Sequence, residues 1–282
     1  MDAVQDARSA VDQLLSQARQ VATPCGTGGL AWRVWGSGAP VVLLHGGSGS
    51  WTHWVRNIPA LVNAGRQVLA VDLPGCGDSA EPPGGGQDAD AAVVPVLDGL
   101  SVLLQGGSCD LVAFSFGSLV GSLLAACDPG LVDRLVVVGG PVLPLTNPRG
   151  AALVAWRNLP DPSARVEAHR ANLLSVMLSR QESATADAVA LHAINVERDR
   201  MRRRRLVTTD AMRRALHRVH CPVSAIYGRQ DALYQDRWPE LMKAVRELPT
   251  LARIAVIEDA GHWVQFEAPD EFNAALADVL RR

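Results

Sequence analysis

Lysine is almost absent from this chain, and neither sign of charge dominates it. Lys243 is the only lysine among the 282 residues, so nearly all basic side chains are arginine, a bias that we attribute to genome composition. The formal net charge is −2. Without an excess of positive charge, no global field draws the chain to nucleic acid or to an anionic membrane. We therefore expect neither as a partner, and a small molecule as the substrate.

Cysteine pairs are also missing. The five cysteines are scattered and odd in number, and no two form a C-x-x-C pair: Cys25, Cys76, Cys109, Cys127 and Cys221. This spacing argues against a disulfide framework and against a zinc site. We expect neither a metal nor a cofactor.

The sequence also shows no pattern typical of a targeting segment or of a membrane-spanning segment. The chain opens with Met1-Asp2 and early acids, not with a basic stretch followed by an apolar one, so we expect no secretory signal. No apolar run reaches the roughly 18 residues that a membrane span needs. The expected location is the cytoplasm, and 48% hydrophobic residues suit a globular protein with a sizeable core.

Short apolar runs recur along most of the chain. Six of them, rich in Val, Leu and Ile, occupy residues 41–44, 68–71, 111–114, 135–138, 223–226 and 254–257. Runs without alternation are typical of strands buried on both faces. Helical segments separate them near 52–63, 90–105, 117–127, 236–248 and 269–281. The alternation predicts an α/β fold with a mostly parallel central sheet flanked by helices.

The alternation of apolar runs and helical segments is absent at two places, and this divides the chain into four parts. Residues 4–21 carry apolar side chains at helical spacing and predict an N-terminal helix within residues 1–24. We expect that helix on the core; packing on a partner chain, and hence a homodimer, is the alternative. Residues 142–218 contain no strand-like run, are helical in composition, and have prolines at their entrance. They predict a helical cap inserted between two parts of the core, 25–141 and 219–282.

A buried strand leads directly into Ser115 in the sequence Ala113-Phe114-Ser115-Phe116-Gly117. A sharp turn from strand to helix lifts a serine side chain clear of the sheet and aims backbone N–H groups at the helix N-terminus. Ala113 replaces the first glycine of the G-x-S-x-G pattern, but alanine is small enough for the turn. We read Ser115 as a nucleophile; an N-cap serine at an ordinary junction is the alternative.

Glycines follow an earlier strand in His45-Gly46-Gly47-Ser48-Gly49-Ser50. Glycines let the backbone approach a ligand closely, and a tetrahedral oxyanion needs two preorganised N–H donors. We assign these donors to Gly47 and Phe116. The spacing does not fit the G-x-G-x-x-G dinucleotide loop, and His45 is expected to brace the loop.

Two further strand ends complete the set. Asp231 follows the apolar run 223–226, and His262 follows the run 254–257. Because the carboxyl ends of parallel strands share one sheet edge, Ser115, Asp231 and His262 can converge there. A serine hydroxyl needs a base, and the base needs an acid that holds its tautomer. Asp72, at another strand end, is the alternative acid.

The chain resembles the α/β-hydrolase superfamily over nearly its whole length after residue 30. The stretch Val71-Asp72-Leu73-Pro74-Gly75-Cys76-Gly77-Asp78-Ser79 is similar to that superfamily's D-x-P-G-x-G-x-S loop. The tail Gly261-His262-Trp263 through Asn273 resembles the meta-cleavage-product hydrolases, which cut a C–C bond in vinylogous diketo acids. The resemblance implies a Ser-Asp-His triad, a helical cap and no cofactor.

Several features depart from that subfamily. Phe114 stands where an asparagine usually precedes the nucleophile, and the loop at Ser48 lacks a proline. The subfamily binds its substrate's carboxylate with a cap arginine, and His192 stands near that position. Trp51, Phe114 and Trp263 are candidate walls of an apolar pocket, and Trp54 is a weaker one. The arginine run 198–205 is read as a solvated face of a cap helix, with an anionic-substrate dock as the alternative.

We therefore expect a serine hydrolase that forms an acyl-enzyme on a carbonyl substrate with an apolar arm. A carboxylic ester and the C–C bond of a diketo acid rank nearly level. In the C–C route the substrate first ketonises and the leaving group is a carbanion equivalent. A ligand-binding protein on the same fold, or a cofactor-free oxygenase or perhydrolase, are the alternatives.

Overall fold

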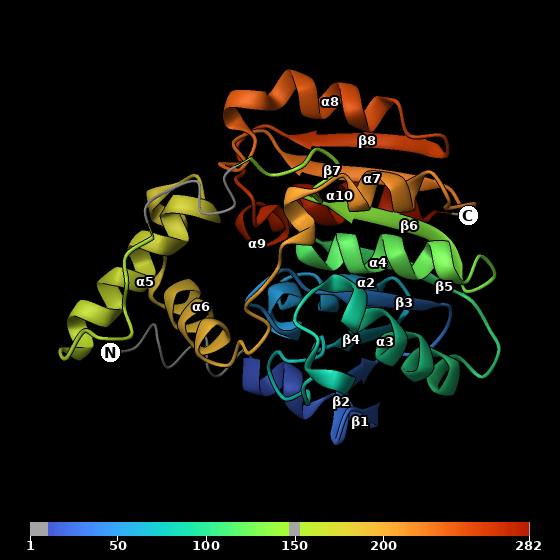
Figure 1. Cartoon of the computed structure of the whole chain (residues 1–282), viewed down its shortest axis with the longest axis horizontal. Helices are drawn as coiled ribbons and strands as arrows, with labels where there is room; N and C mark the ends of the chain where they lie inside the picture. The colour runs from blue at the N-terminus through green and yellow to red at the C-terminus, as the bar shows by residue number, and fades with distance from the viewer. Residues whose placement is uncertain (1–10, 147–152, 282) are drawn as a thin grey trace.

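The computed structural model describes residues 11–146 and 153–281. Within them an eight-stranded sheet runs through the molecule in the order β1-β2-β4-β3-β5-β6-β7-β8 (Figure 1). The strands are β1 (Arg19–Cys25), β2 (Gly28–Trp35), β3 (Pro40–Leu44), β4 (Gln67–Val71), β5 (Cys109–Phe114), β6 (Val132–Val138), β7 (Val223–Gly228) and β8 (Leu251–Ile257). The pairs from β4 to β8 are parallel, whereas β2 pairs antiparallel with both β1 and β4. The predicted mostly parallel α/β sheet is confirmed.

The central strands are apolar on both sides because helices cover both faces of the sheet. In β5 every residue is buried, and its side chains alternate between two cores. Leu111 and Ala113 belong to one core, Val112 and Phe114 to the other. Helices α3 (Ala89–Leu104), α4 (Phe116–Cys127), α7 (Ala211–Leu216) and α8 (Trp238–Arg246) contribute to the first core; α2 (Ile58–Asn63), α9 (Val264–Glu267) and α10 (Pro269–Leu280) contribute to the second. Each face therefore buries a continuous apolar layer.

The predicted helical insertion lies between β6 and β7. Its helices α5 (Pro162–Val176) and α6 (Ala186–Glu197) pack on each other and stand beside the sheet (Figure 1). Pro162 opens α5, where its missing N–H costs no hydrogen bond, and Asp161 caps the first turn. Helix α7, later in the same segment, packs against α4 instead. The division into four domains stays a prediction.

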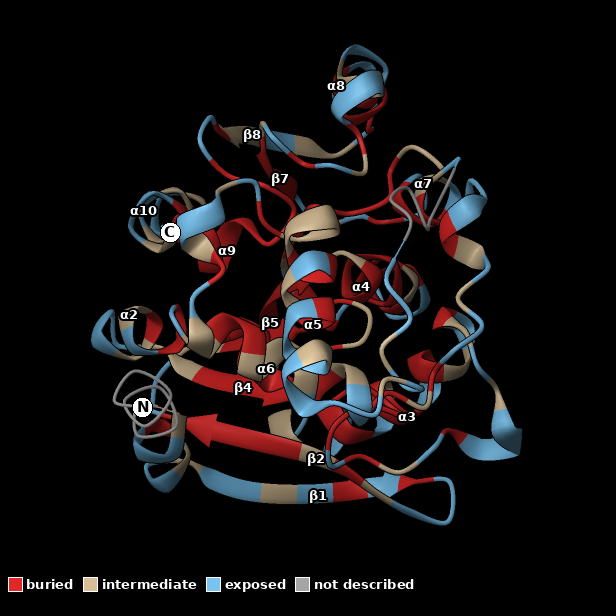
Figure 2. Cartoon of the chain, turned by 90° about the vertical axis from the view of Figure 1, so that its left-hand side faces the viewer, coloured by how far each residue is buried: buried red, intermediate tan, exposed pale blue. Residues whose placement is uncertain are grey.

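The predicted helix over residues 4–21 is wrong at its C-terminal end. Residues 11–16 are helical, but β1 begins at Arg19, and residues 4–10 lie outside the described residues. Strand β1 is an edge strand (Figure 2), and its first two residues, Arg19 and Gln20, are polar and exposed, so they imitate the polar side of an amphipathic helix. The Leu14 carbonyl accepts the indole N–H of Trp35 at 2.7 Å, which ties the short helix to β2.

Gly26 and Thr27 form the hairpin turn between β1 and β2, and neither strand was predicted. Gly26 has a φ of +55°, which an L side chain rarely adopts. Among residues 11–146 and 153–281, no helix is both long and apolar enough to cross a membrane.

Candidate active site

Ser115 stands on the sharp turn between β5 and α4. Its backbone has φ +52° and ψ −116°, an unusual conformation for a residue with a side chain. Its N–H donates to the Val138 carbonyl at 2.8 Å, and its own carbonyl accepts the N–H of Ser118 at 2.9 Å. These bonds hold the strained turn, and Phe116 begins α4 directly after it. The local structure is that of a nucleophile elbow.

Two small contacts explain why this sequence can make the turn. A β-carbon at Gly117 would collide with the carbonyl oxygens of Leu44 and His45 at the end of β3, so only glycine fits there. Ala113, which replaces the usual first glycine, faces Gly121 one turn into α4. A β-carbon at Gly121 would stand 3.1 Å from that of Ala113, so the absence of a side chain at Gly121 leaves room for the methyl group.

Ser115, His262 and Asp231 form one hydrogen-bonded chain at the carboxyl ends of their strands. Nε2 of His262 lies 2.8 Å from Oγ of Ser115, and Nδ1 of His262 lies 2.7 Å from Oδ2 of Asp231. His262 is 2% exposed and Asp231 is fully buried. The second oxygen of Asp231 accepts the N–H of Leu233 at 2.9 Å. The carboxylate is thus fixed at both oxygens, and the imidazole is oriented toward the serine.

Close backbone packing makes this convergence possible. Gly228 ends β7, and a β-carbon there would collide with the carbonyl oxygens of Ala260 and Gly261. The loop that carries His262 therefore lies directly on the end of β7, three residues before Asp231. Gly139, at the end of β6, lies under the imidazole, where a β-carbon would come within 3.2 Å of the ring.

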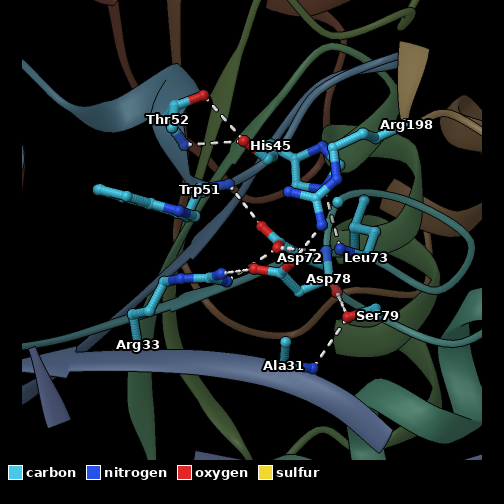
Figure 3. A network of polar contacts seen from close by, with 12 residues as sticks. Ala31, Arg33, His45, Trp51, Thr52, Asp72, Leu73, Asp78, Ser79 and Arg198 are labelled. Atoms are coloured by element: carbon cyan, nitrogen blue, oxygen red, sulfur yellow. Dashed lines mark hydrogen bonds and ion pairs between the residues drawn. The ribbon is translucent and has the colours of Figure 1, made fainter. Parts of the chain in front are cut away.

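Asp72, the alternative acid, belongs to a different network (Figure 3). Its Oδ2 accepts from Nη1 of Arg33 and from the N–H of Asp78, and its Oδ1 accepts the N–H of Trp51, all within 2.9 Å. Asp72 therefore holds the loop after β4 against the segment after β3. The geometry favours Asp231 as the acid of the triad.

His45 fills the bracing position expected from the sequence. Its Nε2 accepts the N–H of Leu73 at 2.8 Å, and its Nδ1 donates to the carbonyl of Gly46 at 2.7 Å. Complete burial lowers the pKa of His45 below its usual value. A neutral imidazole thus connects the glycine loop after β3 with the loop after β4.

A cavity of about 630 Å³ opens beside the triad, and Ser115 and His262 lie in its wall. Gly47 and Phe116, the two predicted oxyanion donors, line it as well. Much of the remaining wall is apolar and comes from the inserted segment and the loops around it: Leu145, Leu153, Val154, Trp156, Val176, Met177, Val196, Val207 and Leu233. A serine with an oriented base, next to helix-terminal N–H groups and an apolar cavity, can attack the carbonyl carbon of a substrate with an apolar arm.

Comparison with known proteins agrees with this geometry. The model of the alpha/beta hydrolase family matches residues 41–275. The chain belongs to the alpha/beta hydrolase family. It is 28% identical over 263 residues to a 2-hydroxy-6-oxononadienedioate/2-hydroxy-6-oxononatrienedioate hydrolase of Burkholderia vietnamiensis, covering 86% of this chain and 87% of that protein.

The chain is also similar to a lipase and to a hydrolase of known structure. The chain is 28% identical over 257 residues to the mouse sn-1-specific diacylglycerol lipase ABHD11, covering 85% of this chain and 80% of the lipase. The solved structure of a mutant of the meta-cleavage product hydrolase CumD superposes with a TM-score of 0.74 at 22% identity, covering 94% of this chain and 98% of that one. The structural likeness supports the fold of this alpha/beta hydrolase.

The three aromatic residues expected to wall the pocket of this alpha/beta hydrolase pack in its core instead. Trp263 is fully buried, stacks on Phe266 at 4.0 Å between ring centroids, and donates its indole N–H to the His53 carbonyl at 3.0 Å. Phe114 is fully buried, with its ring 5.0 Å from that of His262. Trp51 is 4% exposed and packs on Trp35.

None of these three residues is in the cavity wall. Trp54, the weaker candidate, is also fully buried in the core. The prediction that these residues wall the cavity was therefore wrong. Phe114 and Trp263 support the site from behind, because Ser115 and His262, which are next to them in sequence, line the cavity.

His192 does line the cavity, from α6. Its ring is 5.8 Å from that of His169, which packs on Trp156. Burial, with His169 nearby, lowers the pKa of His192 to about 4. At neutral pH this position therefore presents an uncharged imidazole to the cavity.

The sequence analysis expected the arginine run to be a solvated face of a cap helix, and the structure shows that it is not helical. Residues 198–206, which we call the arginine strap, have no helix before Leu206 and lie across the core. The N–H of Arg200 donates to the Gly75 carbonyl at 2.8 Å, and the N–H groups of Arg205 and Leu206 donate to Asp88 at 2.6 and 2.9 Å. Arg198 pairs with Asp78 (Figure 3). Acceptors on the core, far away in sequence, hold the strap.

Two residues of the strap are functional candidates that the sequence analysis did not single out from the arginine run. Arg204 lines the cavity, and Asp199 binds its guanidinium. An acid inside an arginine-rich run was the available signal, since a buried arginine needs a partner. Among residues 11–146 and 153–281, no group of three or more His, Cys, Asp and Glu side chains could hold a metal ion.

Proposed function

We propose that this chain is a serine hydrolase that cleaves a carbonyl substrate with an apolar arm through an acyl-enzyme. The observation that carries the proposal is the hydrogen-bonded chain from Asp231 through His262 to Ser115, which opens into the cavity. Its two distances, 2.7 and 2.8 Å, are within hydrogen-bonding reach for proton transfer.

The proposed reaction starts with Oγ of Ser115. As Oγ bonds to the carbonyl carbon, Nε2 of His262 takes its proton and the carbonyl π electrons move to the oxygen. The N–H groups of Gly47 and Phe116 stabilise the resulting oxyanion, and Asp231 stabilises the imidazolium. Collapse of the tetrahedral intermediate expels the leaving group, which receives the proton from His262. Water then repeats the sequence on the acyl-enzyme and releases the acid.

The cavity supports a substrate with an apolar arm. Met177, Val196 and Leu233 belong to its apolar wall, and His192 adds an imidazole that is neutral at pH 7. A volume of about 630 Å³ suits a substrate larger than a short-chain ester. We place a carboxylic ester with an aryl or medium-length acyl group first.

Hydrolysis of a C–C bond in a diketo acid is the second candidate. A specific observation favours it: a relative 28% identical over most of both chains is named as a hydrolase of 2-hydroxy-6-oxononadienedioate. The imidazole of His192 is uncharged at neutral pH, which leaves Arg157 and Arg204 as the cations in the described cavity wall. Asp199 already pairs with Arg204, and this weighs against a substrate with two carboxylates.

A fluorophosphonate probe followed by peptide mapping tests the nucleophile. We expect labelling at Ser115, and Ser115→Ala to lose labelling and several orders of magnitude of turnover. Labelling of another residue, or near-unchanged activity of Ser115→Ala, would refute the proposal. An assay of aryl esters with graded acyl chains, beside a 2-hydroxy-6-oxo-dienoate, then separates the two substrate classes by kcat/KM. A preference of about a hundredfold for the dienoate, worth about 2.7 kcal/mol, would reverse their order.

A further inference from the structure

Arg204 contacts both residues assigned to the oxyanion hole. A β-carbon placed on Gly47 would lie 3.2 Å from Nη1 of Arg204 and 3.3 Å from its Cζ, so the guanidinium packs over the space that a side chain at Gly47 would enter. The same guanidinium stands 5.2 Å from the ring centroid of Phe116. Arg204 lines the cavity together with Ser115. A cation from the inserted segment thus stands beside the place where negative charge would develop.

Asp199 holds this cation on its far side. Nη2 of Arg204 donates to both carboxylate oxygens of Asp199 at 2.7 Å, and the two side chains are 19% and 8% exposed. Oδ1 of Asp199 also accepts the N–H of Met201 at 3.0 Å. Arg204 is in the cavity wall, whereas Asp199 is not. The pair is therefore a dipole with its positive end toward the cavity.

Ser48 joins this ion pair to the oxyanion loop. Its Oγ donates to Oδ2 of Asp199 at 2.6 Å and accepts from Nη1 of Arg204 at 3.2 Å. Ser48 has a φ of +49°, in the left-handed region, where a residue with a side chain is strained. These two bonds hold the strained residue next to Gly47. The conformation of the oxyanion loop thus depends on two residues of the arginine strap.

One donor of Arg204, its Nε–H group, makes no hydrogen bond within the described residues. The Nε atom is also buried. A buried N–H without a partner is costly, and it is tolerated where a ligand or a transition state supplies the acceptor. Nε would lie 3.4 Å from a β-carbon on Gly47, on the same side as Nη1.

We propose that Arg204 is an electrostatic component of the oxyanion hole, supplied by the inserted segment and positioned by Asp199 and Ser48. This inference rests on the proposed function. When Oγ of Ser115 bonds to the carbonyl carbon, the π electron pair becomes a negative charge on oxygen. The field of Arg204 stabilises that charge in a partly buried site, where it is weakly screened. The field acts on the transition state more than on a neutral ground state, so it raises kcat and leaves KM nearly unchanged.

Substitution of Arg204 by methionine, which keeps most of the length and removes the charge, tests this role. With neutral aryl esters we expect kcat and the rate of phosphonylation of Ser115 to fall about 10- to 100-fold, less than the loss of a direct oxyanion donor because the charge stands beside the hole. KM should change little. Arg204→Lys should retain part of the rate, since it keeps the charge without the forked geometry. Arg203→Met, at an exposed neighbour in the strap, is the matched control and should behave like the parent chain.

Removal of Arg204 alone leaves Asp199 buried without its cation, which can unfold the strap. The double variant Asp199→Asn with Arg204→Met removes both charges together. It should still lower kcat, but by no more than Arg204→Met does, because no unpaired carboxylate is left near the oxyanion, and its unfolding transition should stay cooperative. Equal phosphonylation rates in Arg204→Met, the double variant and the parent chain would overturn the inference. So would a loss confined to KM for substrates with a carboxylate, since that is the result expected of a substrate anchor.

The same labelling experiment separates the two proposals. If the parent chain is not labelled at Ser115, the proposed function fails. If the parent chain is labelled at Ser115 and loss of Arg204 leaves the rate unchanged, only the role of Arg204 fails.

Discussion

The carboxylate of Glu267 accepts the backbone N–H of Gly261 at 2.6 Å, one residue before His262. The same fully buried carboxylate accepts the N–H groups of Ser179 and Arg180 at 2.9–3.1 Å, just after α5. A second bond runs in parallel, because the N–H of Trp263 donates to the carbonyl of Met177 at 2.7 Å. Glu267 therefore joins the loop that carries the base to the segment that forms part of the cavity wall.

Glu267→Gln should disturb both loops at once. The amide keeps one acceptor oxygen but turns an NH₂ group toward backbone N–H donors, so at least one bond is lost. We expect the free energy of unfolding to fall by about 2–4 kcal/mol, as for a buried, charged acceptor of several bonds. We also expect kcat to fall, because His262 loses its fixed position. Urea unfolding and ester turnover measure the two effects.

Glu271→Gln is the matched control, since Glu271 is exposed four residues later. It should leave both stability and turnover near those of the parent chain. If Glu267→Gln also leaves both unchanged, the buried carboxylate does not hold the two loops in the way that the contacts suggest.

The acid of the triad can be identified by a pair of asparagine variants. Asp231→Asn should lower turnover by about 10⁴-fold, because the amide no longer holds the imidazole in the required tautomer. Asp72→Asn should be milder in turnover per folded molecule, since Asp72 binds Arg33 and two backbone N–H groups outside the triad. Its cost should appear in the free energy of unfolding. The reverse order of the two turnover rates, measured on one ester, would assign the role to Asp72.

Burial pattern and strand-end chemistry explain what could be predicted from the sequence. The strands β3 to β7 are mostly buried on both faces and β8 ends in an apolar run, so the parallel sheet follows from their alternation with helices. Ser115, Asp231 and His262 each follow such a run, so one sheet edge brings them together. β1 begins with two exposed polar residues, Arg19 and Gln20, and this pattern does not distinguish an edge strand from an amphipathic helix.

The pocket could not be predicted in the same way. A strand buried on both sides gives no sign of which face looks toward the cavity, so Phe114 and Trp263 were placed by proximity in sequence alone. Arg204 and Ser48 meet across 156 positions in the chain. No local pattern encodes a contact of that kind, because the topology of the insertion decides it.

Cysteine reactivity should follow burial. Burial raises the pKa of Cys76 and of Cys109 to about 12, that of Cys221 to about 11, and that of Cys25 above its usual value. At pH 8 a thiol with a pKa of 12 is ionised in only about one molecule in 10⁴, and the thiolate is the reactive form. Cys127 is exposed. With iodoacetamide under native conditions we expect Cys127 to be alkylated first and the others only in urea.

Peptide mapping by mass spectrometry reads the order of alkylation. Cys127→Ser should remove the fast phase and leave turnover unchanged, since Cys127 ends α4 at the opposite end from Ser115. Rapid alkylation of Cys76 in the folded chain would contradict its burial beneath the arginine strap.

Four buried or half-buried histidines should make the fold sensitive to mild acid. Burial lowers the pKa of His45 and of His169, lowers that of His53 well below its usual value, and lowers that of His192 to about 4. In the unfolded chain a histidine titrates near pH 6.5. Between the lowered pKa of each histidine in the folded chain and its pKa in the unfolded chain, the unfolded state binds more protons than the folded state. The free energy of unfolding therefore falls as the pH falls. Each histidine contributes a slope of at most about 1.4 kcal/mol per pH unit.

Urea unfolding at pH 7.5, 6.0 and 5.0 should therefore show a steady loss of stability below pH 6.5. His192→Gln should flatten the slope, whereas His220→Gln, at an exposed position, should not. A stability that is constant from pH 7.5 to 5.0 would mean that these imidazoles can take up protons in the folded chain.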